Sequence, residues 1–190
     1  MTATATKKNG EGQASRERQT RPPGLLAQLA AEVKERLGEA WLPTVYRDRI
    51  LSMRTRSHHL SLYAKRAADV EIQHTLLGVE LRVGRRRMSC PDLATARYLA
   101  VFARANCADV AVPYDISRIS GLADELESAW HRMLLLVEHA ASGRSAAMRS
   151  RLRNFLIQEV KREVAQAGAG ADRPQFNQNT KQRPVRDKQG

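Results

Sequence analysis

Cysteine is scarce in this chain of 190 residues, which has two, Cys90 and Cys107. They form no CxxC pair, and no histidines join them at zinc-ligand spacing, so neither a disulfide framework nor a zinc site is indicated. We expect both to be reduced, buried thiols. Residues 1–20 contain no apolar run of the kind found in a signal peptide. These absences predict a cytoplasmic protein.

Long apolar runs are also missing, because no stretch reaches the roughly 18 apolar residues of a membrane span. Aromatic residues make up 5% of the chain, and no aromatic run of the RNP type occurs. Hydrophobic residues still reach 42%, which is enough for a core. A chain of this length normally forms one domain, so we predict a single globular unit.

The signature motifs of common enzymes are absent as well. The sequence contains no P-loop, GxGxxG, HExxH, GxSxG or EF-hand loop. Adjacent His58 and His59 point to opposite faces of a strand, and His131 and His139 are too far apart on one predicted helix to chelate one ion. We interpret His74, in phase with apolar neighbours, as a core histidine. The sequence predicts no metal and no cofactor.

Positive charge is what the chain has in excess. Lys and Arg number 32 against 20 Asp and Glu, which gives a formal net charge of +12 and a pI near 10.5. Such an excess favours anionic partners, either nucleic acid or an anionic membrane surface.

Both ends of the sequence lack apolar side chains. Residues 1–23 are rich in Thr, Gly, Gln and Arg, and residues 167–190 combine an Ala/Gly opening with prolines and a Gln/Asn-rich middle. Such segments cannot offset the entropy cost of ordering, so we predict two disordered basic tails around one domain at residues 24–166. Each tail holds five Lys/Arg and two Asp/Glu, so the tails together carry half of the excess charge.

The apolar spacing in the first half predicts helices followed by strands. A helix from Leu25 stops at Gly38, and a second helix with Pro43 in its first turn spans roughly 43–56. Alternation of apolar and polar residues then predicts strands near residues 60–63, 70–73 and 79–83. Gly84 permits a turn into the following arginines, which predicts an antiparallel meander.

The second half is mainly helical. Pro91 and Asp92 open a helix that ends near Asn106, and a short buried strand covers 110–112. A long helix beginning near Ser117 or Ser120 and a last helix ending before Gly168 are joined by a short link, which favours an antiparallel hairpin. The predicted fold is α+β, with N-terminal helices, a small antiparallel β-meander, one crossover helix and strand, and a C-terminal helical hairpin.

Three sets of arginines are candidates for phosphate contacts. The first follows the predicted turn of the meander and comprises Arg82, Arg85, Arg86 and Arg87. The second flanks the helix predicted at 43–56 and comprises Arg47, Arg49, Arg54 and Arg56. A guanidinium can bond two phosphate oxygens at once. The alternative for both sets is a solvated surface whose arginine stems cover apolar neighbours.

A third basic set has a competing explanation, because acidic residues of the preceding helix can neutralise it. It comprises Arg144, Arg149, Arg151 and Arg153, and the expected partners are Asp124, Glu125 and Glu127. Tyr63 and Lys65 share a predicted strand face that could stack unpaired bases, although we favour a surface-packing role for the tyrosine.

The sequence thus predicts a non-enzymatic nucleic-acid-binding protein whose arginines contact the phosphate backbone largely without reading sequence. One alternative is a metal-dependent nuclease with converging carboxylates. Its candidate ligands are Glu80, Asp92, Asp109 and Asp115. Another is an adaptor or homodimer formed through the helices of residues 117–164, with Trp130 and Phe155 as anchors. Packing of both anchors within one chain is the simpler expectation.

Overall fold

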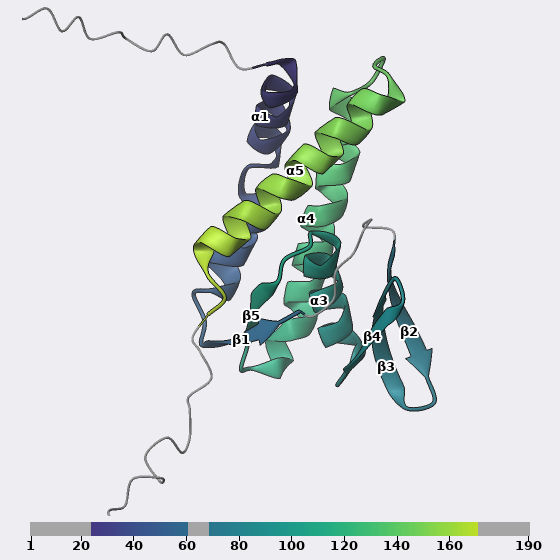
Figure 1. Ribbon diagram of the computed structural model, residues 1–190. Coiled ribbons are helices and arrows are strands. Elements are labelled where there is room, and N and C mark those ends of the chain that lie inside the picture. Colours follow the sequence, from purple (N-terminus) through teal and green to yellow (C-terminus); the bar gives the residue numbers. More distant parts are fainter. Residues whose placement is uncertain (1–23, 61–68, 171–190) are drawn as a thin grey trace, which may run out of the picture.

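The computed structural model describes residues 24–60 and 69–170 and has the predicted α+β architecture (Figure 1). Its main elements are α1 (Leu25–Leu37), α2 (Leu42–Val45), β1 (Thr55–His59), β2 (Val70–Thr75), β3 (Gly78–Val83), β4 (Arg86–Cys90), α3 (Leu93–Arg104), β5 (Asp109–Pro113), α4 (Ile119–Ala140) and α5 (Ala146–Ala167). Short helical turns η1 (Gly38–Ala40), η2 (Tyr46–Ile50) and η4 (Ile116–Arg118) connect some of them.

The helices pack against α4. Its apolar stripe, which includes Leu126, Trp130 and Met133, is buried, and α1, α2, α3 and α5 all contact it. Helix α5 returns after a short link as the predicted antiparallel hairpin, and the Ser145 hydroxyl caps its first turn by accepting from the Met148 N–H. The predicted stop at Gly143 is confirmed by its φ of +73°, which only glycine adopts without strain.

In the described part of the chain, five strands form two separate antiparallel sheets. One is the predicted meander, with strand order β2-β3-β4, and the other pairs β1 with β5. Cross-strand neighbours Ile72, Leu81 and Met88 share the face of the meander that packs on α3. Helix α3 therefore has the meander on one side and α4 on another (Figure 1).

The helix predicted for residues 43–56 is wrong beyond Ile50. The chain leaves η2 there, turns, and enters β1 at Thr55, whose side chain is buried and which pairs with Pro113. The apolar spacing misled because Met53, although in a turn, is partly buried against the core. The strand predicted near 60–63 also begins earlier, and residues 61–63 lie outside the described residues.

A buried hydroxyl joins three distant segments. Tyr46 Oη donates to the Gly168 carbonyl at 2.7 Å and accepts from the Ala111 N–H at 2.8 Å, while Tyr98 Oη donates to the Ala111 carbonyl. Burial raises the pKa of Tyr46 to about 12, so the hydroxyl stays protonated and can donate. These bonds hold η2, β5, α3 and the end of α5 together.

The described structure continues to residue 170, four residues beyond the boundary at 166 that the sequence predicts. Helix α5 ends at Ala167, and Gly170 approaches β1 so closely that an added Cβ would lie 2.5 Å from Thr55 Oγ1. Among the described residues, no helix is long and apolar enough to cross a membrane.

We predict that Tyr46→Phe destabilises the protein by about 1–3 kcal/mol, because it leaves the Ala111 N–H and the Gly168 carbonyl without their buried partner. The measurement is chemical denaturation followed by circular dichroism. The matched control is Tyr114→Phe at a part-exposed position, which should stay within about 0.5 kcal/mol. If both changes lowered the free energy of unfolding by the same small amount, the hydrogen bonds of the buried Tyr46 hydroxyl would not be important for stability.

Candidate nucleic-acid interface

Two predicted arginines, Arg54 and Arg56, are exposed on either side of buried Thr55. Strand pairing brings residues from the far half of the chain beside them, because Thr55 pairs with Pro113 and the Tyr114 N–H donates to the Arg54 carbonyl at 3.1 Å. We name the surface formed by Arg54, Arg56 and Tyr114 the β1 surface.

The β1 surface combines cations with an accessible aromatic ring. The Arg54 guanidinium lies 5.1 Å from the ring centroid of Tyr114, which is 42% exposed. No ion pair within the described chain involves Arg54 or Arg56. Arg118 contacts the carboxylate of Asp115 at 3.4 Å. The sequence analysis did not identify Tyr114, because its position beside Arg54 depends on strand pairing between distant parts of the chain.

The β1 surface also lies where the C-terminal basic segment begins. Gly170 packs against the side chains of Thr55 and Ala111, on the face of the sheet opposite to the Arg56 side chain. Residues 171–190, which follow directly in the chain, contain five Lys/Arg and two Asp/Glu. The last described residue before this segment is therefore held at β1, the strand that carries Arg56 and directly follows Arg54.

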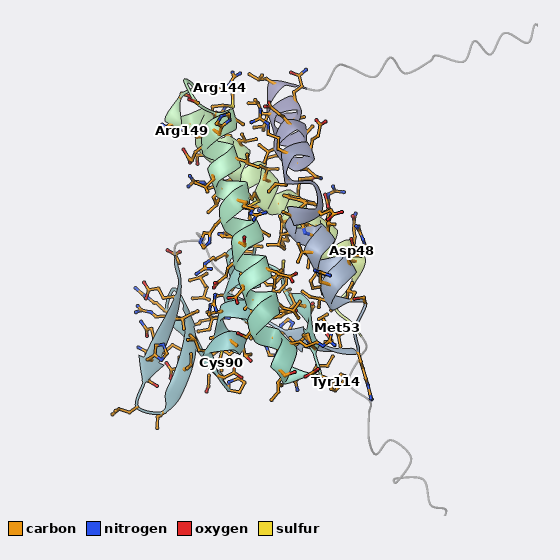
Figure 2. All side chains as sticks on the ribbon, turned by 180° about the vertical axis from the view of Figure 1, so that it is seen from behind. Asp48, Met53, Cys90, Tyr114, Arg144 and Arg149 are labelled. Carbon is orange, nitrogen blue, oxygen red and sulfur yellow. The ribbon has the colours of Figure 1, made fainter. Side chains whose placement is uncertain are left out.

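The other half of the second arginine set is neutralised. Arg47 pairs with Asp48 at 2.9 Å, and Arg49 approaches Glu125 of α4 at 3.5 Å. Asp48, Arg49 and Glu125 line a groove of about 440 Å³ between η2 and α4, and Figure 2 shows Asp48 and Met53 along this side. The groove carries both signs of charge and so offers no net attraction for an anion.

The four arginines of the meander do not converge at one turn, which corrects the prediction. The turn holds Gly84 and Arg85, whereas Arg86 and Arg87 belong to β4 and point to opposite faces. Arg87 lies opposite Arg82, and these two approach Glu80 and Glu71 respectively at 3.7 Å. All three consecutive arginines are exposed, but only Arg85 is at the tip.

The third arginine set has other partners than predicted. Arg149 and Arg153 both bind Glu138, and these hydrogen bonds lower the pKa of that carboxyl. Two of the predicted partners, Asp124 and Glu127, instead form ion pairs with Arg97 of α3. Arg144 and Arg151 have no ion-pair partner among the described residues. Figure 2 places Arg144 and Arg149 at the opposite end of the molecule from Tyr114.

The four carboxylates of the nuclease alternative serve four separate structural roles. Asp92 caps α3 by accepting from the Thr95 N–H at 2.7 Å, and Asp115 accepts from the N–H and hydroxyl of Ser117, which lowers its pKa. Asp109 binds His59 Nδ1 at 2.7 Å, and Glu80 faces Arg87. Within residues 24–60 and 69–170, no cluster of three His, Cys, Asp or Glu side chains could hold a metal ion.

The remaining candidates have structural positions. Cys90 and Cys107 are buried free thiols as predicted, and burial raises the pKa of Cys107 to about 12. Trp130 is buried and Phe155 half-buried within the same chain. His74 is exposed rather than in the core, because its end of β2 extends towards the hairpin tip. Tyr63 and Lys65 lie outside the described residues.

Comparisons of the chain with models of protein families, with curated proteins and with solved structures give no match.

Asp92 provides a test of the structural role of these carboxylates. We predict that Asp92→Ala costs about 1 kcal/mol of stability, because the α3 cap is lost, while Asp92→Asn keeps most of it since asparagine also caps helices. Melting temperatures measured with and without magnesium check this. A magnesium-dependent stabilisation that both variants lose would contradict the capping role and favour the nuclease.

Proposed function

We propose that the protein is a non-enzymatic nucleic-acid-binding protein that contacts the phosphate backbone through the β1 surface. The observation that carries the proposal is the Arg54 guanidinium over the exposed ring of Tyr114, with exposed Arg56 two residues further along the chain. Gly170, the residue before the basic segment 171–190, packs against Thr55 of the same strand. Both guanidiniums are available to a ligand because no carboxylate among the described residues engages them.

Phosphate is the chemistry that suits this surface best. A guanidinium fork bonds two phosphate oxygens, and a neighbouring basic segment of the chain adds further positive charge. The net charge of +12 increases the rate of encounter with a polyanion and makes the affinity depend on salt. Contacts of guanidiniums with phosphate carry no sequence information, so we propose binding that is largely independent of sequence.

The meander arginines take a secondary role in this proposal. Arg82 and Arg87 each face a glutamate, so their charge is partly cancelled before any ligand arrives. Arg85, at the turn, is exposed and has no ion pair within the described part of the chain. We propose that it adds one peripheral phosphate contact. We also propose that the protein acts in the cytoplasm, where Cys90 and Cys107 stay reduced.

A double charge reversal tests the β1 surface. We predict that Arg54→Glu with Arg56→Glu weakens binding to a fluorescent oligonucleotide at least about tenfold, equivalent to roughly 1.4 kcal/mol, because two phosphate contacts are replaced by repulsion. The matched control is Arg144→Glu with Arg151→Glu, which makes the same change in net charge at exposed residues that also lack carboxylate partners. It should weaken binding much less.

The comparison separates local contacts from the general effect of net charge. Equal losses in the two double variants would mean that only the total charge matters. A larger loss in the Arg144 and Arg151 variant, with the fold intact by circular dichroism, would move the interface to the end of the helical hairpin.

The ring of Tyr114 predicts a preference for unpaired bases. Stacking on an exposed aromatic ring contributes about 1–3 kcal/mol per base in single strands, whereas bases inside a duplex are not available. We expect Tyr114→Leu to weaken binding to single-stranded oligonucleotides several-fold and to leave duplex binding almost unchanged, with Tyr114→Phe as the neutral control. Equal loss on both ligands in fluorescence titrations would show that the ring only positions Arg54.

A further inference from the structure

Two adjacent leucines are the most exposed large apolar side chains among the described residues. Leu76 and Leu77 form the tip of the β2–β3 hairpin and are 106% and 93% exposed. Tips of two-residue hairpins are normally polar or glycine-rich, because the turn points into water. A pair of leucines there adds nothing to the core of its own chain.

The hairpin holds the two leucines firmly outward. Thr75 pairs with Gly78 across the turn, and the Thr75 hydroxyl both donates to the Gly78 carbonyl at 3.1 Å and accepts from the Leu77 N–H at 3.2 Å. Gly78 has a φ of +126°, which other residues rarely adopt. These hydrogen bonds and the backbone conformation of Gly78 hold the turn in a conformation in which the side chains of Leu76 and Leu77 are exposed to solvent.

The same chain carries an apolar pocket of matching character. It has a volume of about 300 Å³ and lies between the C-terminal end of α1 and the middle of α4. Its lining residues are Arg36, Leu37, Ala40, Arg132, Leu135 and Leu136. Leu135 is 70% exposed on its rim. The volume is at the lower limit for ligand pockets, which suits one or two aliphatic side chains.

The rim of the pocket is cationic. Arg36 binds Glu32 and His139, whereas Arg132 has no ion pair within the described residues. A hairpin turn exposes backbone carbonyls, which accept hydrogen bonds from guanidinium groups. The leucine side chains of the tip can therefore enter the apolar pocket, while backbone carbonyls of the tip accept hydrogen bonds from the arginines at the pocket rim.

The tip and the pocket of one chain are too far apart to meet. Figure 1 shows the β2–β3 hairpin pointing away at one end of the molecule, while α1 occupies the other end. The braced turn and the packing of the meander on α3 keep it there. An occupant of the pocket with this chemistry must come from a second molecule.

We propose that the Leu76-Leu77 tip of one copy occupies the α1–α4 pocket of a second copy, and that the exchange is reciprocal, which gives a two-fold dimer. Closed two-fold dimers are the commonest homo-oligomers, and reciprocal contacts are self-complementary by construction. One tip in one pocket buries far less than the roughly 1,600 Å² of a standard interface, so the second contact is needed for stability. The interface uses neither Arg54 nor Tyr114 and is independent of nucleic-acid binding.

The test is sedimentation of the full chain over protein concentrations of about 1–100 µM. Wild type should move from monomer to dimer in this range. Leu76→Asp with Leu77→Asp, and separately Leu135→Asp, should each weaken dimerisation at least about tenfold. All three residues are exposed, so the fold should be unchanged by circular dichroism.

Two further measurements test whether the tip of one copy pairs with the pocket of the other. Ile116→Asp, a 71% exposed apolar residue outside both partners, should leave dimerisation unchanged. A mixture of the tip variant with the Leu135→Asp variant keeps one intact tip and one intact pocket per heterodimer, so it should associate more tightly than either variant alone.

Three results would overturn the proposal. They are a wild-type protein that stays monomeric throughout the range, a tip variant that dimerises normally, and a Leu135→Asp variant that dimerises normally although the tip variant does not. Binding of a monomeric protein to lipid vesicles through Leu76 and Leu77 would likewise replace it.

Discussion

The hydroxyl of Tyr46 is the contact on which the arrangement of the molecule most depends. It donates to Gly168 and accepts from Ala111, so one buried group joins the first helical region, the β5 strand and the end of the last helix. Tyr98 completes the set by donating to the Ala111 carbonyl. Because unpaired buried polar groups are costly, these four residues fix one another's positions.

The proposed interface follows from that constraint. Once β5 and the end of α5 are held against η2, β1 pairs with β5, and Gly170 meets Thr55. The residue before the basic segment 171–190 is thus held at the strand that carries Arg56. Elsewhere the structure pairs arginines with carboxylates, as in Arg97 with Glu127 and Arg153 with Glu138. Arg54 and Arg56 differ from these arginines because no carboxylate of the described residues engages them.

Much of the architecture could be predicted from the sequence, because periodicity and turn residues are local signals. The helical hairpin, the meander and α3 with its Asp92 cap all follow from such signals. The helix predicted through residue 56 was wrong because Tyr46, Ile50 and Met53 are spaced like a helical stripe while the chain actually turns after Ile50. Tyr46 and Ile50 are buried and Met53 is partly buried against the core, so their spacing matches that of a helical stripe although Met53 is not in a helix.

The site was less predictable than the fold. Arg54 and Arg56 were identified from charge alone, but their neighbour Tyr114 is brought in by the pairing of Thr55 with Pro113, which no local pattern reveals. The triplet at 85–87 was assigned to a turn because Gly84 precedes it, yet the strand resumes at Arg86 and alternation separates the side chains. Ion pairs with Glu71 and Glu80 likewise depend on strand register.

The most direct test of the central claim is the salt dependence of binding, compared between the full chain and a chain that ends after Gly170. Each neutralised phosphate contributes about 0.7–0.9 to the log–log slope of affinity against salt. The account predicts a slope of several units for the full chain and a clearly smaller, but still measurable, slope for the shortened chain, whose β1 surface is intact. A flat response, or no residual slope without residues 171–190, would contradict it.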